Sequence, residues 1–567
     1  MKEIKWNSIN WIDHERFVFG IQMEIYKNVK NGADVTRLQG QIINSIEAKR
    51  LAVKRVTQDN KGKRTAGIDG VKSIDPSQRL KLSLGLTLNN HASPVLRINI
   101  PKPGSLEMRP LGIPTIEDRA KQALVKFALE PEWEARFENN SYGFRPGRSA
   151  IDATWRIRHK LRFGPQWVWD VDIAKCFDRI DHKALLMKLN APLEIQVQVE
   201  AWLNAGIFIG GHAYPSAGMG TPQGGVISPL LANIALDGLQ EEIWNAVYAK
   251  TGRKSDANKL LFIRYADDFV LISPELGWLN EGEKTTRDVL GRMGLEVSEK
   301  KSQIIYSGEC KEGFNFLGFN FRQIKVGRHK EKRTGRWGHT EKYQVIVVPN
   351  KAGVVKHFRA INHCIKRARS AFELISHLNP IMRGWRNYFR YSDARTYGNK
   401  PSAWDSRVVL KLIRWVTRQT GKHGRPKEFW TSVKGDNWIF KAKNPKDLET
   451  EVRLCRYAQV EWSLVTYNRI QSARSPFDGD VTYWMNHAPR SPAGSIIGQS
   501  GKIQFLLKAQ KGICRQCKKP FSPISLIEVH HKKPRSRGGN ESWQNQEVLH
   551  KECHQLLHNT AGQKLCE

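Results

Sequence analysis

The sequence has few of the features that mark secreted, membrane-spanning or repetitive proteins. It contains 8 cysteines among 567 residues, too few for a disulfide-bonded scaffold, and this scarcity favours a reducing compartment. No stretch approaches the roughly 18 consecutive apolar residues of a membrane span. Residues 1–16 hold no uninterrupted apolar segment of the secretory type. We therefore expect a cytoplasmic protein with no membrane partner.

Acidic residues are also scarce relative to basic ones. The chain has 55 Asp+Glu against 91 Lys+Arg, which gives a formal net charge of +36. Hydrophobic residues still make up 40%, so large cores can form, and the length predicts about four domains of roughly 150 residues. A positive excess of this size attracts polyanions. It indicates a nucleic-acid partner rather than a charge that only keeps the protein soluble.

Periodicity predicts the broad organisation of the chain. Apolar positions such as Ile21 and Ile25 recur at helical spacing and predict helices over residues 9–58. From about 95 to 345, short β-like runs alternate with helical stretches, which predicts a mixed α/β domain. Residues 428–505 are expected to be irregular.

The segment 352–427 differs from the rest in charge. It holds 17 Lys+Arg and 3 acidic residues, with apolar positions at helical spacing and aromatic residues among the basic ones. A solvated helix face is the usual explanation of a basic run. The interleaved aromatics favour a helical surface that follows a nucleic-acid backbone.

Two distant segments place aspartates within strand-like runs. The first, residues 167–173, is rich in β-branched and aromatic side chains. Alternation along a strand puts Asp170 and Asp172 on one face and the bulky apolar residues on the other. In the second, apolar runs flank Tyr265-Ala-Asp-Asp268, which predicts a hairpin with Asp267 and Asp268 at its turn.

Paired aspartates in apolar surroundings are costly because like charges repel in a low dielectric. A divalent cation removes that cost, and Mg²⁺ prefers oxygen ligands of this kind. Two such ions stabilise the attacking and leaving oxygens of a phosphoryl transfer. An isolated Asp-Asp pair is more often a polar turn, so the prediction depends on the surrounding motifs.

The surrounding motifs resemble the group II intron-encoded reverse transcriptase–maturases, and they occur in the order of that family. The matching blocks are RPLGIPT at 109–115, SYGFRPGR at 141–148, DIAKCFD at 172–178, TPQGGVISPL at 221–230, GLEVS at 294–298 and FNFLGF at 314–319. The resemblance implies a multidomain α/β (α+β) protein with right-hand fingers and palm, a helical thumb (maturase X), a DNA-binding region and a small ββα-metal HNH zinc module. The implied domains are 1–95 (N-terminal helical extension and start of the fingers), 96–345 (fingers and palm), 346–427 (thumb), 428–505 (DNA-binding region) and 506–567 (HNH endonuclease).

The resemblance also implies roles for single residues. Asp172, Asp267 and Asp268 would hold two Mg²⁺ ions, with the Ile173 carbonyl adding a ligand. Phe177 would lie under the incoming sugar and select dNTPs. The implied nucleotide-binding residues are Lys102, Arg109, Ile173, Phe177, Gln223 and Tyr265. Asp170 is expected to be a structural neighbour.

The basic helical segment resembles the thumb of this family, which clamps a template–primer duplex and binds the intron RNA. The expected nucleic-acid contacts there are Lys366, Arg367, Arg383, Arg386 and Arg390. RNA recognition of this type depends on shape and on stacking of exposed bases.

Near the C-terminus, Cys514 and Cys517 form one pair at metal-ligand spacing, and His550 and Cys553 form another. Two such pairs can close a tetrahedral Zn²⁺ site. In a small module the zinc would supply much of the folding free energy.

The residues between these pairs resemble an HNH nuclease. By that resemblance His530 and His554 hold a divalent ion, Mg²⁺ or similar. His531 is the general base, Asn545 orients it, and Lys532 and Lys533 contact the DNA. Many family members have Cys at the position of His550, so this histidine is either a zinc ligand or part of the catalytic site. A purely structural zinc finger is the alternative explanation for the His pair.

Together these observations predict an RNA-directed DNA polymerase and maturase of a mobile group II intron. It would bind the intron RNA, assist splicing, nick target DNA with the HNH domain, and reverse-transcribe the intron by target-primed synthesis (retrohoming). It would be cytoplasmic in a bacterium, and nucleoid-associated when bound to DNA. The alternatives are a splicing-only maturase and a host-adopted reverse transcriptase. A DNA-only nuclease would leave residues 60–430 unexplained.

Overall fold

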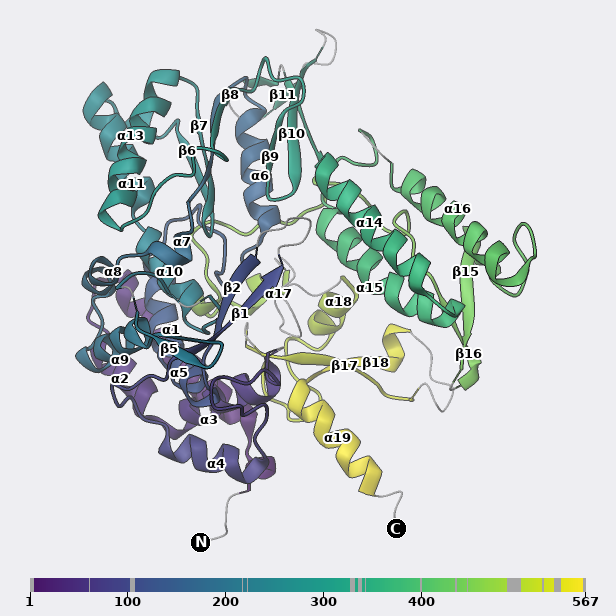
Figure 1. The fold of residues 1–567 in the computed structure, drawn as a ribbon, viewed down its shortest axis with the longest axis horizontal. Helices are drawn as coiled ribbons and strands as arrows, with labels where there is room; N and C mark the ends of the chain where they lie inside the picture. The colour runs from purple at the N-terminus through teal and green to yellow at the C-terminus, as the bar shows by residue number, and fades with distance from the viewer. Residues whose placement is uncertain are drawn as a thin grey trace. The chain divides into compact units, whose positions relative to one another are not determined.

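The structure, a computed structural model, describes most of residues 5–563 and divides into two compact units. The first unit comprises residues 1–153, 168–304 and 469–567, and the second comprises 154–167 and 305–468 (Figure 1). The residues not described are 1–4, 61, 102–107, 217, 222, 327–331, 335–338, 342, 398–399, 434–435, 446, 487–500, 523–524, 535–541 and 564–567.

Helices form the N-terminal part of the first unit, which confirms the prediction for residues 9–58. They are η1 (Trp6–Ser8), α1 (Trp11–Lys30), α2 (Thr36–Asn44), α3 (Ile46–Lys54), a π-helical turn η2 (Arg55–Asp59) and α4 (Pro76–Gly85). Side-chain caps set two of the starts. The Ser45 hydroxyl accepts from the Ala48 amide at α3, and Asp75 with Gln78 forms a capping box at α4.

A small sheet follows in the order β2-β1-β4-β5. Its strands are β1 (Val95–Pro101), β2 (Met108–Ile113), β4 (Ile207–Ile209) and β5 (His212–Tyr214). Strand β1 pairs antiparallel with β2 and parallel with β4. The long helix α5 (Ile116–Arg136) packs against α1, and the buried amide of Gln22 donates to the Phe127 carbonyl at 2.9 Å. The strands and helices together confirm a mixed α/β fold.

The central sheet of the first unit contains β6 (Leu261–Tyr265), β7 (Asp268–Ser273) and β3 (Trp167–Asp172), in that order. Trp169 packs edge-on against Phe269 with ring centroids 5.9 Å apart. Val168, on the aspartate face of β3, is as buried as the residues of the opposite face. The strand therefore exposes little besides its carboxylates.

Helices of the same unit surround these strands. They are α6 (Ala150–Leu161), which crosses into the second unit, α7 (Cys176–Arg179), α8 (His182–Leu189), α9 (Leu193–Asn204), α10 (Ser228–Leu236), α11 (Leu239–Thr251), α12 (Lys254–Ala257) and α13 (Leu276–Arg292). Within the described residues, no helix combines the length and apolar character that crossing a bilayer requires.

The second unit contains the basic helical segment and, among the residues described, three sheets. The helices are α14 (Lys351–Arg367), α15 (Ala371–Phe389) and α16 (Pro401–Thr420), which confirms the prediction for 352–427. One sheet has the order β13-β10-β9. The strands that precede the helices are β8 (Gln303–Tyr306), which begins in the first unit, β9 (Phe314–Phe316), β10 (Phe319–Lys325), β11 (Lys332–Thr334), β12 (His339–Glu341) and β13 (Tyr343–Pro349).

The prediction that residues 428–505 are irregular is wrong for the first third of that region. The strands β14 (Trp430–Val433), β15 (Asp436–Asn444) and β16 (Asp447–Arg453) form an antiparallel sheet. The buried ring of Phe440 lies edge-on to Trp415 of α16, at 6.2 Å between centroids. Charged residues interrupt the apolar alternation here, so the local pattern does not predict these strands. Packing against the helices stabilises them instead.

The C-terminal part belongs to the first unit and builds a small core. Its elements are η4 (Pro476–Asp478), α17 (Val481–Asn486), α18 (Gly501–Ala509), β17 (Ile527–His531), η6 (Trp543–Asn545), β18 (Gln546–His550) and α19 (Lys551–Gln563). Leu507, Phe521 and Val548 are buried together with Ile12 of α1. The two strands and the following helix have the expected ββα arrangement.

Candidate functional site

The first candidate site lies at the β6–β7 hairpin, where the predicted aspartates are found. Tyr265 pairs with Asp268, so Ala266 and Asp267 alone form the loop. Ala266 has φ = 58°, in the left-handed region that two-residue hairpin loops require. A Cβ on Gly143 would lie 2.3 Å from the Ala266 nitrogen. The backbone at Gly143 therefore abuts the loop and fixes where Asp267 and Asp268 point.

Burial, together with neighbouring carboxylates, raises the pKa of three acids at this site. Burial raises the pKa of Asp267, with Asp172 adding to the effect. Burial, Asp267 and Asp172 together raise the pKa of Asp268 to about 6. Burial, Asp268 and Asp172 raise the pKa of Asp170 to about 7. Four acids thus share one poorly solvated region, as the alternation along β3 predicted for Asp170 and Asp172.

Basic side chains offset part of this negative charge. The Lys301 ammonium donates to both carboxylate oxygens of Asp172, each at 3.1 Å. The backbone of Asp172 is held as well, since its carbonyl accepts from the Ser298 amide at 2.8 Å. Arg109 opposes the rise in the pKa of Asp267. Lys301 lies three residues after the GLEVS block, but the sequence contained no signal for its contact 129 residues away.

The donor set at the hairpin fits magnesium. Its donors are carboxylate oxygens, which hard divalent cations prefer, and the crowding that raises the pKa values is relieved by such an ion. Among the described residues, the groups of three or more ligands that already lie within 4.8 Å of one another are both in the C-terminal module. The hairpin aspartates are not among them, and Lys301 occupies the oxygens of Asp172.

The predicted nucleotide-binding residues lie on segments that contact one another. Phe177, on α7, packs edge-on to Phe144 at 6.1 Å between ring centroids, and its carbonyl accepts from the Thr221 amide at 2.6 Å. The Gln223 carbonyl accepts from the Gly112 amide at 2.7 Å, which ties this loop to β2.

The remaining residues of this predicted set differ in exposure. Arg109, on β2, is exposed, Ile173 is buried, and Tyr265 is half-buried, with its pKa raised by burial. Lys102 lies outside the described residues. Hydrogen bonds and ring packing therefore join the loop at Gln223, β2 and α7, which carry most of the predicted set.

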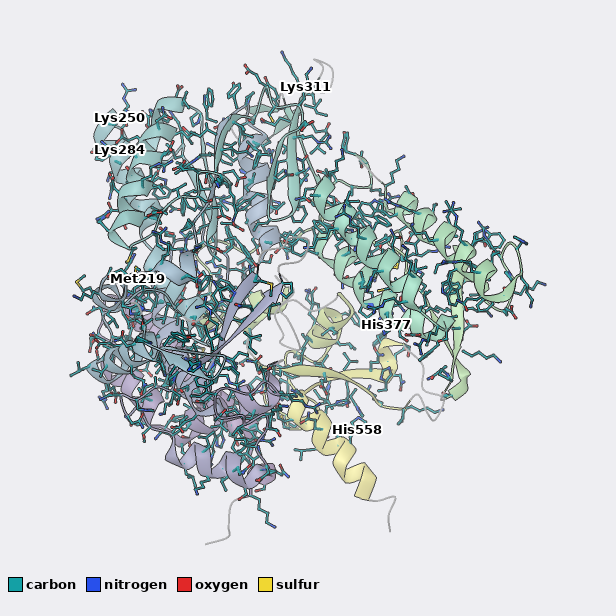
Figure 2. All side chains as sticks on the ribbon, viewed as in Figure 1. Met219, Lys250, Lys284, Lys311, His377 and His558 are labelled. Carbon is teal, nitrogen blue, oxygen red and sulfur yellow. The ribbon has the colours of Figure 1, made fainter. Side chains whose placement is uncertain are left out.

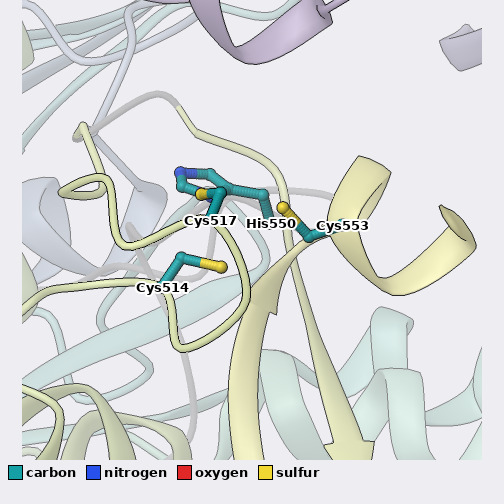
Figure 3. A group of neighbouring side chains, drawn as sticks. All are labelled: Cys514, Cys517, His550 and Cys553. Atoms are coloured by element: carbon teal, nitrogen blue, oxygen red, sulfur yellow. The ribbon is translucent and has the colours of Figure 1, made fainter. Parts of the chain in front are cut away.

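The second candidate site joins Cys514, Cys517, His550 and Cys553 (Figure 3). Their ligand atoms all lie within 4.8 Å of one another. Cys517 Sγ is 3.4 Å from His550 Nδ1. The Cys553 thiol lowers the pKa of Cys514 to about 3, which favours a thiolate. Three sulfurs and one nitrogen form the donor set of structural zinc sites, and His550 lies with the cysteines rather than with the other histidines.

The third candidate site is a histidine cluster on β17 and α19. Ring nitrogens of His530, His554 and His558 lie within 4.8 Å of one another. His554 Nδ1 is 2.6 Å from Glu528 Oε2, which orients this ring. Burial, His554 and His558 lower the pKa of His530, which favours the neutral, metal-binding form. His558 is absent from the sequence prediction, although its position four residues after His554 on a helix was a usable signal.

The other predicted nuclease residues lie beside this cluster. His531 Nε2 is 2.7 Å from the Gln546 amide nitrogen. The Asn545 side chain accepts from the Lys533 amide at 2.9 Å and donates to the Lys533 carbonyl at 3.1 Å. Lys532 and Lys533 are exposed. Asn545 thus fixes the turn that follows His531.

The predicted basic residues of the second unit fall into two groups. Lys366, Arg367 and Arg383 are exposed. Arg386 donates to the Arg456 carbonyl at 2.8 Å, and Arg390 donates to the Tyr391 hydroxyl at 3.0 Å and covers its ring. The first group is available to a nucleic acid, and the second also holds the local fold.

Family models match the chain in four successive segments. These are the N-terminal domain of reverse transcriptase over 6–86, reverse transcriptase (RNA-dependent DNA polymerase) over 100–321, the group II intron maturase-specific domain over 355–433, and HNH endonuclease over 514–560. The hairpin aspartates lie in the second segment. Both C-terminal clusters lie in the fourth.

The matches to these curated relatives cover between 49% and 68% of the chain. Protein YkfC of Escherichia coli (strain K12) is 32% identical over 317 residues, which cover 49% of this chain and 81% of YkfC. The group II intron-encoded protein LtrA of Lactococcus lactis subsp. cremoris is 30% identical over 338 residues, 49% of this chain and 55% of LtrA. The match thus spans about half the length of LtrA. Maturase-like protein 1 of Euglena gracilis is 25% identical over 403 residues, 68% of this chain and 78% of that protein.

Proposed function

Because the chain belongs to the group II intron reverse transcriptase–maturases that carry a C-terminal HNH endonuclease domain, we propose that it drives retrohoming of a group II intron. It binds the intron RNA, assists splicing, nicks target DNA and copies the intron by target-primed synthesis. The observation that carries the proposal is the crowding of Asp172, Asp267 and Asp268 beside the dNTP-binding motifs.

In the polymerase site, Asp172, Asp267 and Asp268 would bind two Mg²⁺ ions. When bound, these ions stabilise the attacking and leaving oxygens of the phosphoryl transfer. The protein's part is positioning. The left-handed loop at Ala266 fixes the two hairpin carboxylates, and Lys301 holds Asp172 through both oxygens.

The nucleotide would bind between the loop at Gln223 and the ring of Phe177. The rings of Phe177 and Phe144 are edge to face, and this pair would leave no space for a 2′-hydroxyl. The exposed Arg109 guanidinium is suited to a triphosphate oxygen, because a planar fork of donors pairs well with phosphate. Lys102 would join it.

In the nuclease, His531 would take the proton from the attacking water. Its hydrogen-bonded neighbour Gln546 orients the ring, and Asn545 fixes the turn beyond it. A divalent ion held by His530, His554 and His558 would stabilise the leaving oxygen. Zinc at Cys514, Cys517, His550 and Cys553 would stabilise the module without taking part in the reaction.

The exposed side chains of Lys366, Arg367 and Arg383 would contact RNA phosphates, as the maturase-specific domain implies for intron RNA. Residues 428–505 would contact target DNA. The three-stranded sheet β14-β15-β16 gives part of this region a rigid surface.

Primer extension with the purified full chain tests the proposal. The reaction contains an RNA template, a DNA primer, dNTPs and Mg²⁺, and compares the natural chain with Asp267→Ala/Asp268→Ala. We expect extension only with the natural chain. Nicking of a plasmid that carries the intron insertion site, and splicing of the precursor RNA, should survive in the variant. If neither chain extends a primer but both promote splicing, the splicing-only maturase replaces the proposal.

The same measurements distinguish the proposed intron protein from a host-adopted reverse transcriptase. Such an enzyme would extend primers without any effect on group II intron splicing. The full proposal therefore requires primer extension, splicing and nicking by one preparation, with each activity lost in its own variant.

A further inference from the structure

A cavity of about 520 Å³ lies in the first unit, between the N-terminal helices and the nuclease helix α19. Its walls come from η2, the loop that follows it, α4 and the first turns of α19. The lining is mostly polar and includes five basic residues against two acidic ones, namely Lys54, Lys63, Arg64, Arg79 and Lys551 against Asp59 and Glu552. The volume is in the range of ligand-binding clefts, and no role described above uses it.

The acidic groups of the cavity are already paired. The buried Lys54 ammonium lies 2.6 Å from Glu552, 3.8 Å from Asp59, and 3.7 Å from Glu15 behind them. Lys551 lies 3.0 Å from Asp59. These contacts join the N-terminal helices to α19 and leave no acid of the lining free for the other basic groups.

Two guanidinium groups remain without a carboxylate partner among the residues described. Arg79 is half-buried, and its Nε atom is buried with no hydrogen-bond partner. Arg64 is exposed at the rim, in a loop that Arg119 anchors through the carbonyls of Gly62 at 3.1 Å and Thr65 at 2.8 Å. Asp75 contributes a favourable charge interaction to Arg79 but forms no ion pair with it. The buried Nε donor of Arg79 is costly while it lacks a hydrogen-bond acceptor, so the two guanidinium groups are suited to receive an anion.

The position of α19 indicates which anion. The same helix carries Lys551, Glu552 and Gln555 on the cavity side and His554 and His558 in the nuclease cluster. A strand whose backbone lies in the cavity therefore contacts the helix that holds the nuclease ligands.

We infer that this cavity binds the phosphodiester backbone of the DNA strand presented to the HNH site, with Arg64 and Arg79 as its phosphate contacts. The N-terminal reverse transcriptase helices thus supply part of the nuclease's substrate site. This inference rests on the nuclease activity of the proposed function for its biological role, but the binding itself does not need that activity.

The test compares the salt dependence of binding for the natural full chain and Arg64→Ala/Arg79→Ala. The probes are a fluorescein-labelled 20-nucleotide DNA strand and the RNA of the same sequence, without added Mg²⁺ so that nothing is cut. Each phosphate contact contributes about 0.7 to the slope of log K against log salt for single strands. We expect the DNA slope to fall by about 1.4, and the RNA slope to fall by a similar amount because both strands carry the same phosphates.

Two further variants control for charge and for folding. Lys284→Ala/Lys311→Ala removes two positive charges outside the cavity (Figure 2) and should leave the DNA slope as it was. Arg64→Lys/Arg79→Lys keeps both positive charges and should restore most of the DNA slope. Such a recovery would show that the loss in the double alanine variant comes from the missing charges and not from unfolding. An unchanged DNA slope, or a loss for RNA alone, would overturn the inference.

Plasmid nicking separates this inference from the proposed nuclease. For a chain that nicks, we expect a higher KM with unchanged kcat in the double alanine variant. A chain that never nicks, yet shows the expected slopes, contradicts the proposed nuclease activity and leaves the DNA site standing.

Discussion

The hairpin of β6 and β7 and the C-terminal Cys/His module prepare ligand atoms in opposite ways. At the hairpin, a sheet and a strained loop hold oxygen ligands that repel one another, and Lys301 supplies the positive charge. In the module, soft and neutral ligands already converge within 4.8 Å in two separate clusters. The large α/β core can hold an unfavourable arrangement for catalysis, whereas the small module needs its ligands to complete its fold.

The largest effect should come from removing a hairpin carboxylate. Asp267→Asn should lower primer extension by about a thousandfold, because a ligand of the reacting ions contributes several kcal/mol to the barrier and each tenfold is about 1.4 kcal/mol. Steady-state primer extension measures it, with the exposed Asp288→Asn on α13 as the matched control. Nicking should not change. Equal losses in both activities would show that the variant disturbs the whole chain.

Removing a proposed zinc ligand should abolish the activity of the C-terminal module and leave that of the hairpin site unchanged. Cys514→Ser should unfold the C-terminal module, because structural zinc supplies folding free energy, and nicking should be lost while primer extension is retained. Zinc content by atomic absorption and limited proteolysis after residue 500 measure the change. Cys364→Ser, a half-buried thiol outside the cluster, is the control. Full zinc content in Cys514→Ser would contradict the assignment.

A smaller effect should follow from the histidine that the sequence prediction omitted. His558→Ala should reduce nicking about a hundredfold, because one ligand of the cluster is lost while His530 and His554 remain. Plasmid nicking at increasing Mn²⁺ measures it, and high metal concentration should restore part of the rate. Leu556→Ala, exposed on the same helix, should nick normally. Unchanged nicking by His558→Ala would remove it from the site.

The smallest effect concerns pH. Burial and the neighbouring aspartates raise the pKa of Asp268 from its ordinary value of 3.8 to about 6, so the folded state binds more protons between about pH 4 and 6. Stability without Mg²⁺ should therefore fall as pH rises through that window. The melting temperature should show a drop of a few degrees, and the drop should be smaller in Asp268→Asn. Added Mg²⁺ at pH 7 should raise the melting temperature of the natural chain alone. Equal pH profiles for both chains would contradict this origin.

Much of this organisation could be predicted from short-range pattern. The strand over 167–172, the hairpin at Tyr265–Asp268, the helices of 352–427 and the Cys/His pairs all have local signals of spacing or alternation. The role of His550 could not be decided by spacing. In the structure His550 is the last residue of β18 and lies with the cysteines. His554 lies on the following helix α19 and belongs to the histidine cluster.

Contacts between distant segments could not be predicted in this way. Lys301 meets Asp172 across the sheet, and Gly143 abuts Ala266 from a separate loop. The sheet β14-β15-β16 depends on packing against α15 and α16, so its charged, interrupted alternation gave no warning. The basic residues of the cavity lie on three separate parts of the chain. In the sequence they contribute only to the net charge of +36, so their clustering could not be predicted.

The pairing of Lys54 with Glu552, and of Ile12 with the C-terminal core, has a consequence for protein engineering. A shortened polymerase that ends before α18 would keep the hairpin aspartates. It would, however, expose Ile12 of α1 and remove Glu552, the nearest of the three carboxylates around the buried Lys54. Such a truncation invites self-association unless both positions are redesigned together, for example with Ile12→Thr and Lys54→Gln. The nuclease module is therefore also a cover for the opposite end of the chain.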